Sequence, residues 1–395
     1  MTPAARVQAA IEILDAVIHA ARTRGAPADR LIADWFKAHR FAGSKDKRAI
    51  RELVYDAVRI CGPVPATGRA AMLALASESE DHDWVLPLFD GSQYGPAAPV
   101  DGEPMAEPGY APAWLEERLI ASGLEEEDAA ALLDRAPLDT RLNSLKPGAS
   151  SGNLPEEGEP LASVAGLRFA PGTQVSLWPA YAEGLIEVQD HGSQLACRAV
   201  GAQPGEVVID LCAGAGGKTL ALAAAMANQG TLIAADTDRR RLSQLGPRAE
   251  RAGARIAAEV LLDPGRELAA LDGWLGRADR VLIDAPCSGT GTWRRNPEAR
   301  WRLTPAELER LTKIQAQLLQ VAAELVRPGG TITYVTCSLL DEEGAGQVQG
   351  FLAANPGWQA QVPDLPLGTP RGPGLRLLPS RDDTDGFFIA RIGKP

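Results

Sequence analysis

Apolar side chains recur every three to four positions through the first 60 residues. Val7, Ile11 and Leu14 follow this spacing, which predicts an amphipathic helix over about the first 20 residues. The same period predicts helices at 31–38 and 45–60. We therefore expect the chain to begin with an all-α domain.

The helical period is lost in residues 91–110, where proline and glycine are frequent. We interpret this stretch as a linker that follows the N-terminal domain, residues 1–90. A small α/β module is expected beyond the linker, at 111–187. Its predicted helices and strands lie at 113–121, 125–136, 140–145, 167–169 and 174–177.

From Val188 to the end, short apolar runs alternate with helical periods. Strands are predicted at 207–211, 231–235, 257–262, 281–283, 331–336 and 387–391, and helices at 219–226, 239–252 and 305–326. The last helix has a complete start signal, with Thr304 as N-cap, Pro305 at the first position and Glu307 as capping-box partner. This alternation predicts the α/β fold class, with a doubly wound, mostly parallel sheet in residues 188–395.

The composition is that of a globular protein, with 45% hydrophobic and 23% charged residues. The net charge of −11 argues against a general nucleic-acid coat protein. The charge is uneven, because residues 1–60 carry 11 basic and 7 acidic side chains, whereas residues 61–140 carry 3 and 16. The basic side chains between Lys37 and Arg51 are typical of a solvated helix face, and the alternative is a patch that contacts RNA phosphates.

Several protein classes are disfavoured by what the sequence lacks. It has no apolar run of about 18 residues and no signal-peptide pattern at its N-terminus, so we expect a cytoplasmic protein without a membrane segment. The 5 cysteines include no Cys-x-x-Cys pair, and the 4 histidines show no metal-ligand spacing. Neither a disulfide framework nor a metal site is therefore expected.

A glycine-rich loop from Asp210 to Thr219 follows the first strand of the last domain and opens a helix. A phosphate-binding P-loop would need a glycine where Cys212 stands, and a dinucleotide fingerprint fits imperfectly because Thr219 stands in place of its last glycine. Glycines preceded by an acid also suit S-adenosylmethionine, whose charged amino-acid end needs backbone and carboxylate partners. The loop residues expected to bind this cofactor are Cys212, Ala213, Gly214, Ala215, Gly216, Gly217 and Lys218.

Acidic residues also end the next two predicted strands. Asp236 lies about 20 residues beyond the glycine loop, where an acid holds the ribose hydroxyls of a bound nucleotide. Asp263 ends the third strand, and we expect it to meet the adenine. A lone aspartate is more often a cap or turn residue, but an acid at each of three strand ends favours a binding site.

Two cysteines lie at predicted strand ends. A short buried run leads into Asp284 and Cys287, and Cys337 follows the strand at 331–336. In a mostly parallel sheet these ends lie at one edge, so we expect both thiols to face one crevice. A single free cysteine is usually a small buried apolar residue, but two at equivalent positions suggest a nucleophile and a helper.

These features belong to an ordered set of motifs. Its members are Arg141–Lys146, Gln189-Asp190, Asp210–Thr219, Asp284–Gly291, Arg294–Pro297, Thr336–Ser338 and Asp385–Phe388. The set resembles the motifs of the Sun/RsmB-type RNA cytosine-5 methyltransferases over residues 111–395, and residues 1–90 resemble the NusB-like helical domain of its bacterial ribosomal-RNA branch. The sequence departs from the family at Ala213-Gly214-Ala215, where many members have Ala-Ala-Pro, and at 147–160, where they usually have a helix.

The resemblance implies a Rossmann-like, S-adenosylmethionine-dependent enzyme that methylates carbon 5 of a cytosine in RNA, with 16S ribosomal RNA as the expected substrate. It implies that Cys337 is the nucleophile that adds to carbon 6, and that Cys287 assists product release. Asp284 would bind the ring-nitrogen side of the base, with Lys218 as an electrostatic partner. The NusB-like domain at 1–90 and the module at 111–187 are both expected to bind RNA. We expect RNA as the partner, no membrane and no metal, and a monomer.

Several alternatives stay open. The same chemistry could act on transfer RNA. A DNA cytosine-5 methyltransferase would use Cys287 as its nucleophile and would not need Cys337, whereas a non-catalytic RNA-binding ribosome-assembly factor would need neither thiol. Four arginines after the Cys287 loop are expected to meet RNA phosphates or to lie in a solvated loop: Arg294, Arg295, Arg300 and Arg302.

Overall fold

The computed structural model describes residues 1–395, which form two compact units. The first, here called the helical unit, comprises residues 1–134 and 292–304, and the second, the sheet unit, comprises residues 135–291 and 305–395. These bounds differ from the predicted domains, because the predicted helix pair at 113–136 groups with the N-terminal helices. None of the helices has the length and apolar composition needed to span a membrane.

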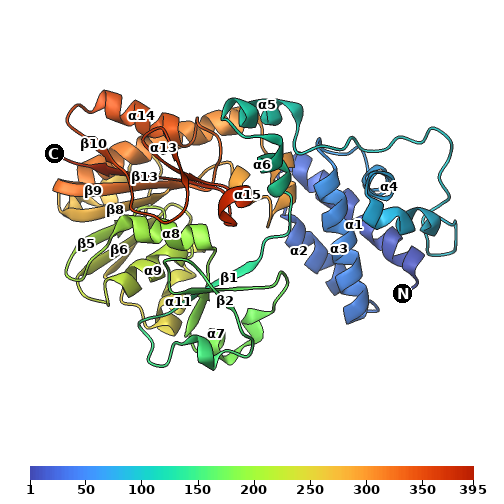
Figure 1. Cartoon of the computed structure of the whole chain (residues 1–395), viewed down its shortest axis with the longest axis horizontal. Coiled ribbons are helices and arrows are strands. Elements are labelled where there is room, and N and C mark those ends of the chain that lie inside the picture. The colour runs from blue at the N-terminus through green and yellow to red at the C-terminus, as the bar shows by residue number, and fades with distance from the viewer. The chain divides into compact units, whose positions relative to one another are not determined.

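The helical unit is built from short and medium-length helices (Figure 1). They are α1 (Pro3–Thr23), α2 (Ala28–Ala38), α3 (Ser44–Ile60), α4 (Gly68–Glu78), η1 (Glu80–Leu88), α5 (Ala113–Ala121), α6 (Glu126–Ala131) and η6 (Pro297–Trp301). The helices predicted at 31–38 and 45–60 are confirmed as α2 and α3.

Helix α1 lies against most of its neighbours in this unit. Val7 and Leu14 are completely buried in its core, as the helical period predicts. Gly68, at the start of α4, approaches α1 so closely that a Cβ atom there would lie 2.3 Å from the Ile11 carbonyl oxygen. The Gly68 amide donates a 2.6 Å hydrogen bond to the Asp15 carboxylate, so a polar contact also joins the two helices at this point. A glycine is therefore required where α4 begins.

The predicted linker, residues 91–110, contains no helix or extended strand and is fastened to the helical unit. The Ala106 amide donates to the Ala70 carbonyl at 3.0 Å, and the Gly109 amide donates to the Ile60 carbonyl at 3.1 Å. Arg69 also pairs with Glu103. The stretch therefore lies along the helices as a bound loop.

The second piece of the helical unit, residues 292–304, enters its core. Arg300 is 0% exposed, and its guanidinium donates to the carbonyls of Val58 at 2.6 Å and Cys61 at 2.8 Å, where α3 ends. The last carbonyls of a helix lack partners within the helix, so Arg300 satisfies them. Arg302 donates to the carbonyls of Gly25 and Ala26. The predicted phosphate contacts are therefore wrong for Arg300 and Arg302, because both bind backbone oxygens.

The sheet unit contains a nine-stranded sheet with helices on both faces (Figure 1). Its strands are β5 (Val207–Asp210), β6 (Thr231–Asp236), β7 (Ala258–Leu261), β8 (Ala278–Asp284), β9 (Val326–Thr336), β10 (Gln359–Gln361), β11 (Thr369–Arg371), β12 (Gly374–Leu377) and β13 (Phe387–Gly393). Its helices are α8 (His191–Val200), α9 (Gly217–Ala225), α10 (Arg239–Leu242), α11 (Leu245–Ala252), α12 (Glu267–Ala270), η4 (Asp272–Trp274), α13 (Pro305–Leu325), α14 (Ala345–Ala354) and α15 (Pro379–Asp382), and η5 (Thr290–Thr292) crosses the unit boundary.

The strand order of the large sheet is β11-β12-β13-β9-β8-β5-β6-β7, and β10 pairs with β13. Strands β9, β8, β5, β6 and β7 run parallel, while β13 pairs antiparallel with β9. Leu318 of α13 and Phe351 of α14 pack in one core, and Leu195 of α8 and Leu222 of α9 pack in another. The predicted doubly wound α/β fold is thus confirmed.

A smaller antiparallel sheet occupies residues 138–188 of this unit. Its order is β2-β3-β1-β4, with β1 (Leu138–Leu142), β2 (Glu159–Pro160), β3 (Gly166–Phe169) and β4 (Ile186–Val188), and its short helices are η2 (Ser151–Asn153), η3 (Val175–Leu177) and α7 (Pro179–Ala182). Buried Asn143 fastens this sheet to α11, since its side-chain amide donates to the carbonyls of Gly184 and Ala252 at 2.8 Å.

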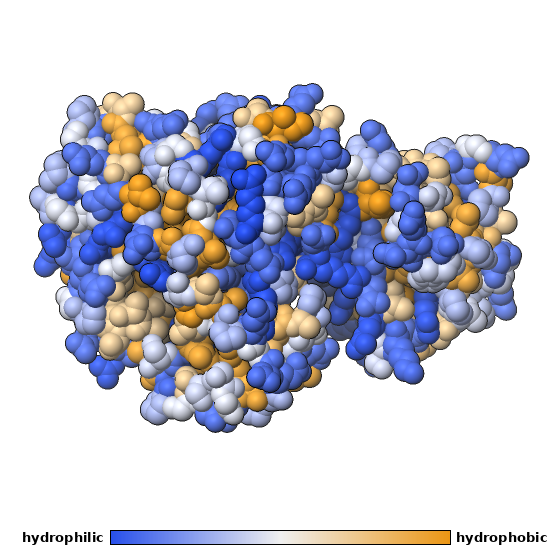
Figure 2. Space-filling view, in the orientation of Figure 1, coloured by the Kyte–Doolittle hydropathy of each residue, from blue (hydrophilic) through white to orange (hydrophobic).

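Several elements differ from the predicted ones, and strands β2, β10, β11 and β12 are among those that were not predicted. The strand predicted at 174–177 is wrong, because the Leu177 amide bonds back to Gln174 and forms η3. The helix predicted at 239–252 is split into α10 and α11, since Pro247 has no amide hydrogen for a bond to the preceding turn. Strand β4 was not predicted. On the face seen in Figure 2, hydrophobic residues are scattered among hydrophilic ones.

Candidate active site

The parallel strands of the large sheet end beside one cavity of about 600 Å3. Asp236 is the last residue of β6 and Asp284 the last of β8, and both line it. Its other lining residues include Cys212, Leu262, Cys287 and Cys337. A ligand site beyond the carboxyl ends of strands is the rule for open α/β sheets. Residues predicted from separate strands therefore meet here.

The glycine-rich loop is held in place by Asp236. One carboxylate oxygen of Asp236 accepts a 2.7 Å hydrogen bond from the Gly214 amide. Gly214 has φ +55°, and a Cβ atom there would lie 2.4 Å from the Arg241 guanidinium. Gly216 has φ +89°, and its Cβ would lie 2.2 Å from Leu245. Both positions favour glycine for their backbone conformation, while the side-chain ends of Arg241 and Leu245 would have to shift to admit a Cβ atom.

Asp210 lies at the end of β5 under this loop. It is completely buried, and its carboxylate accepts a 2.7 Å hydrogen bond from the Thr219 hydroxyl. Its second oxygen has no partner. Burial raises the pKa of Asp210 to about 7. This carboxyl therefore supports the loop from beneath and does not line the cavity.

Lys218, on the first turn of α9, binds Asp284 across the sheet edge. Its ammonium lies 2.8 Å from a carboxylate oxygen of Asp284. Burial alone lowers the pKa of Lys218, but the charge of Asp284 outweighs it and leaves that pKa above its usual value. Lys218 stays charged at neutral pH, so it fixes the orientation of the Asp284 carboxylate at the cavity wall.

The two predicted thiols are neighbours. Cys287 Sγ and Cys337 Sγ lie 3.4 Å apart, although 50 residues separate them in the sequence. The hydrogen bond with Cys337, then burial and the nearby charges, raise the pKa of Cys287 well above its usual value. The expectation that both thiols face one crevice agrees with this geometry, because both line the same cavity.

The loops that carry the thiols are joined below the cavity. The Gly291 amide donates to the Cys337 carbonyl at 2.9 Å, and the Leu339 amide donates to the Thr290 hydroxyl at 2.8 Å. The hydroxyls of Ser288 and Ser338 lie 3.1 Å apart. These bonds hold the two loops together, so the spacing of the thiols is a property of the folded chain.

The hydrogen-bonding groups and the size of the cavity suit S-adenosylmethionine. Asp236 has further lone pairs to accept ribose hydroxyls, and pockets of 300–1,000 Å3 are usual for small ligands. Asp263 is exposed and does not itself line the cavity, although its neighbours Leu262 and Pro264 do. Glu267, which sequence reasoning missed, lines the cavity and accepts a 2.9 Å hydrogen bond from Gln317. The adenine contact of Asp263 stays a prediction.

No group of three or more histidine, cysteine or acidic residues could hold a metal ion.

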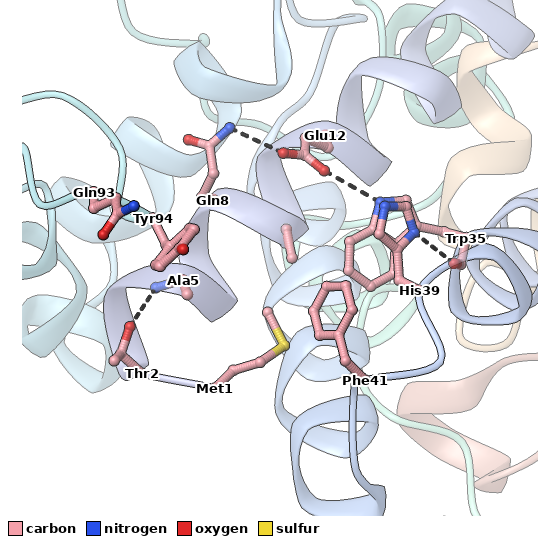
Figure 3. A pocket seen from close by; sticks show the side chains of 12 residues that line it. Met1, Thr2, Ala5, Gln8, Glu12, Trp35, His39, Phe41, Gln93 and Tyr94 are labelled. Carbon is pink, nitrogen blue, oxygen red and sulfur yellow. Dashed lines mark hydrogen bonds between the residues drawn. The ribbon is translucent and has the colours of Figure 1, made fainter.

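A second hollow, here called the aromatic groove, lies in the helical unit (Figure 3). Its volume is about 920 Å3. The rings of Trp35 and His39 stack with their centroids 3.9 Å apart, and Phe41 stands edge-on to His39 at 5.7 Å. Phe41 and Tyr94 are 70% and 66% exposed. Glu12 accepts hydrogen bonds from Trp35 and Gln8, both at 3.3 Å.

Basic side chains surround Phe41 in the sequence. Five of them are exposed, and none forms an ion pair with a carboxylate: Lys37, Arg40, Lys45, Lys47 and Arg48. Cations without carboxylate partners are available to bind phosphates.

Residues 198–393 match the family model described as 16S rRNA methyltransferase RsmB/F. Ribosomal RNA small subunit methyltransferase B of Klebsiella pneumoniae (strain 342) is 38% identical over 230 residues, which are 58% of this chain and 51% of that protein. The protein of the same name from Sodalis glossinidius is 32% identical over 322 residues, 78% of this chain and 71% of that protein. The chain thus spans about half the length of some curated relatives that it matches.

The likeness extends to the three-dimensional fold. The crystal structure of PH0851 superposes with a TM-score of 0.77 at 25% identity, covering 100% of this chain and 99% of that chain. This match includes both compact units, whereas the family model covers most of the sheet unit and, of the helical unit, only residues 292–304. From the family model and the relatives together, the chain belongs to the RsmB/F family of 16S rRNA methyltransferases.

Proposed function

We propose that this chain methylates carbon 5 of a cytosine in RNA, with 16S ribosomal RNA in the cytoplasm as its substrate. The proposal rests above all on the two thiols 3.4 Å apart, each just beyond the end of one of two neighbouring parallel strands. A methyltransferase that alkylates an oxygen or an exocyclic nitrogen needs no such pair, because those atoms are nucleophiles themselves. Carbon 5 of cytosine needs covalent activation.

Cys337 is assigned the attack on the base. Its thiolate adds to carbon 6, and the electrons of the carbon 5–carbon 6 double bond move into the ring and make carbon 5 nucleophilic. Asp284 would hydrogen-bond the ring-nitrogen side of the base, and Lys218 holds that carboxylate in place at 2.8 Å. The cytosine must leave its stack to reach this cavity.

S-adenosylmethionine is the cofactor of the methyltransferases with this fold, and when bound it supplies the methyl group that carbon 5 receives. Cys212 and Asp236 would hold it from the cavity wall, beside the glycine-rich loop. Asp236 has two roles here, because the same carboxylate positions the Gly214 amide.

Cys287 is assigned the release of the product. After methylation, carbon 5 carries both the methyl group and its original hydrogen. The thiolate of Cys287 takes this hydrogen as a proton, and the electrons of the carbon–hydrogen bond restore the carbon 5–carbon 6 double bond. The bond between carbon 6 and Cys337 then breaks, with its electron pair returning to sulfur. The largest cause of the raised pKa of Cys287 is its hydrogen bond with Cys337. That bond is lost once Cys337 Sγ is bonded to carbon 6, so Cys287 can then release its own proton to solvent and act as the base.

The aromatic groove and its cations are assigned to RNA docking. Exposed aromatic rings such as Phe41 and Tyr94 are stacking platforms for unpaired bases, and cations without carboxylate partners suit the phosphates. The carboxylate of Glu12 repels phosphate, so within the groove it would instead accept a hydrogen bond from the amino group of a base. This assignment deepens the prediction that the N-terminal domain binds RNA.

Two cysteine variants test the chemistry in one methyl-transfer assay with 16S ribosomal RNA, transfer RNA and DNA. Cys337→Ala should abolish both methylation and any covalent adduct. Cys287→Ala should still form the adduct and fail to resolve it, so that protein and RNA migrate together on a denaturing gel. The reverse pattern would identify Cys287 as the nucleophile, and near-normal turnover in both variants would contradict covalent catalysis. Activity on transfer RNA alone, or on DNA alone, would contradict the proposal that 16S ribosomal RNA is the substrate.

A further inference from the structure

A buried carboxylate lies directly beneath the Cys287 loop. Glu343 is 0% exposed and follows Cys337 by six residues. One of its oxygens accepts 2.9 Å hydrogen bonds from the Ser288 amide and from the side chain of Gln315, and the other accepts a bond from the Ser288 hydroxyl. The residue after Cys287 is therefore bound through both its backbone and its side chain.

Gln315 extends this arrangement to the residue before Cys287. It lies on α13, is completely buried, and donates from one nitrogen to both Glu343 and the Pro286 carbonyl at 2.9 Å. Pro286 and Ser288 are thus both fixed, one on each side of the thiol. Neither Glu343 nor Gln315 belongs to the motifs that predicted the site.

Glu343 is itself fixed to the strand that carries the other thiol. The buried Tyr334 hydroxyl, on β9, donates to the Glu343 carbonyl at 2.7 Å. Strand β9 leads into Cys337. Glu343 therefore links the two thiol-bearing segments, because its carboxylate binds the loop of Cys287 and its backbone carbonyl binds the strand that leads into Cys337.

The surroundings of the Glu343 carboxylate argue against a purely structural role. It forms no ion pair with a lysine or arginine, and its carboxylate partners are neutral donors. Burying an ionised carboxylate without a cation is costly, and an apolar residue of the same size would fill the space at a lower cost. The position of this carboxylate, directly beneath the Cys287 loop, points instead to a role in the reaction.

We infer that Glu343 is a positioning residue for product release, which holds residues 286–288 so that Cys287 can take the proton from carbon 5. The inference rests on the proposed division of roles between the two thiols. Its negative charge also contributes, after the hydrogen bond with Cys337 and burial, to the raised pKa of Cys287. Loss of Glu343 should therefore impair release and leave the attack by Cys337 in place.

The test compares Glu343→Gln with Cys287→Ala in the full-length protein. Glu343→Gln keeps the volume but loses the charge and part of the acceptor set, and it should slow release by about tenfold or more, as expected when hydrogen bonds to a buried charge are lost. The covalent protein–RNA complex should accumulate on a denaturing gel, as in Cys287→Ala. RNA that contains 5-fluorocytosine, which has no proton to release at carbon 5, should trap Glu343→Gln as readily as wild type.

The exposed neighbour provides the matched control. Glu342→Gln removes a carboxylate one residue away and should turn over like wild type, without an accumulated adduct. The pH profile of the release rate should also shift to lower pH in Glu343→Gln, because the charge that helps raise the pKa of Cys287 is gone. A scaffold role alone would leave this pH profile unchanged.

The outcomes separate the inference from the proposed function. If Cys287→Ala accumulates the adduct and Glu343→Gln does not, the inference fails and the proposed function stands. If neither variant accumulates it, the release role of Cys287 itself fails. If Glu343→Gln does not fold, Ser288→Ala provides a second test. This variant removes one hydrogen-bond donor to Glu343, so it should accumulate the adduct to a smaller extent. Release at the wild-type rate in Ser288→Ala would overturn the inference.

Discussion

The cavity of the sheet unit and the aromatic groove of the helical unit are built in opposite ways. Around the cavity, the polar side chains bind one another: Asp236 holds the Gly214 amide, Lys218 holds Asp284, and the thiols pair. In the groove, the rings of Phe41 and Tyr94 are exposed and nearby cations have no carboxylate partners.

This difference agrees with the demands of the two proposed tasks. Covalent chemistry needs reacting groups held within a fraction of an ångström, and a connected network of buried hydrogen bonds provides that. Binding a flexible single strand needs stacking surfaces and charge that adapt to the ligand. Changes near the cavity should therefore alter rates or stability steeply, whereas changes in the groove should alter RNA affinity gradually.

The largest expected effect concerns the buried Asp210 beneath the glycine loop. Burial raises the pKa of Asp210 in the folded state to about 7, above its value in the unfolded chain, so the folded state favours the protonated form. The stability from this group is fully present below the unfolded pKa and is lost as the pH rises through about 7. Relative to Asp210→Asn, wild type should lose roughly 2–4 kcal/mol of unfolding free energy between about pH 4 and pH 8.

Urea unfolding of both proteins at a series of pH values measures this difference. A constant difference across the range would show that Asp210 is ionised when folded, with its charge compensated. An exposed charge next to Phe41 in the sequence offers the contrast, since Arg40→Gln should not introduce a comparable pH dependence.

The next effect concerns the cofactor. Asp236→Ala should weaken S-adenosylmethionine binding by roughly 1–3 kcal/mol, a typical cost for losing a hydrogen bond to a charged group. The Gly214 amide would also lose its partner, so the loss should exceed that of Asp263→Ala, whose side chain is exposed. Calorimetry with both variants measures this order, and equal affinities in wild type and Asp236→Ala would remove Asp236 from the site.

The smallest effect is expected in the groove. Removing the rings of Phe41 and Tyr94 should weaken RNA binding by about 1–3 kcal/mol per stacked base and leave cofactor affinity unchanged. Trp84→Ala is a suitable control, because Trp84 is 50% exposed and does not line the groove. Fluorescence anisotropy with a single-stranded RNA measures the affinities. Equal losses in the control would mean that any exposed ring serves, and the groove would lose its assigned role.

Much of the fold could be predicted from periodicity because long, regular segments bury one clear face. The helix at Pro305–Leu325 combined such a face with a complete start signal, and its predicted bounds differ by one residue. The short segments were harder. The apolar residues at 174–177 form a helical turn and not a strand, since Val175 is buried in a small core while Leu177 is exposed. Only the tertiary packing separates these two outcomes.

The residues that line the cavity could be predicted where they lie in compact motifs, and the residues that support them could not. Asp284 and Cys287 are adjacent to a recognisable strand end, and Cys337 repeats the pattern. Glu343 and Gln315 act through contacts between segments that are 28 residues apart. No local pattern predicts such a pair, because the residues next to Glu343 in the sequence do not show whether its side chain is buried or exposed.

The arginines after the Cys287 loop show the converse error. Their number and place made phosphate contacts a natural hypothesis, but Arg300 and Arg302 bind backbone carbonyls of the helical unit. Charge counts cannot show whether a guanidinium meets an external phosphate or an internal helix end.

The segment at 292–304 also sets the order in which the protein can be completed during synthesis. The helices α1 to α4 leave the ribosome before the segment at 292–304. The carbonyls at the end of α3 therefore lack their partner until Arg300 has been synthesised, and the core of the helical unit is incomplete until Trp301 has been synthesised. Some 240 residues are translated between the helix end and its partner. The helical unit is therefore the first to begin folding and cannot finish before most of the sheet unit has been made. A shortened chain that ends at residue 134 should accordingly remain loosely packed and prone to proteolysis.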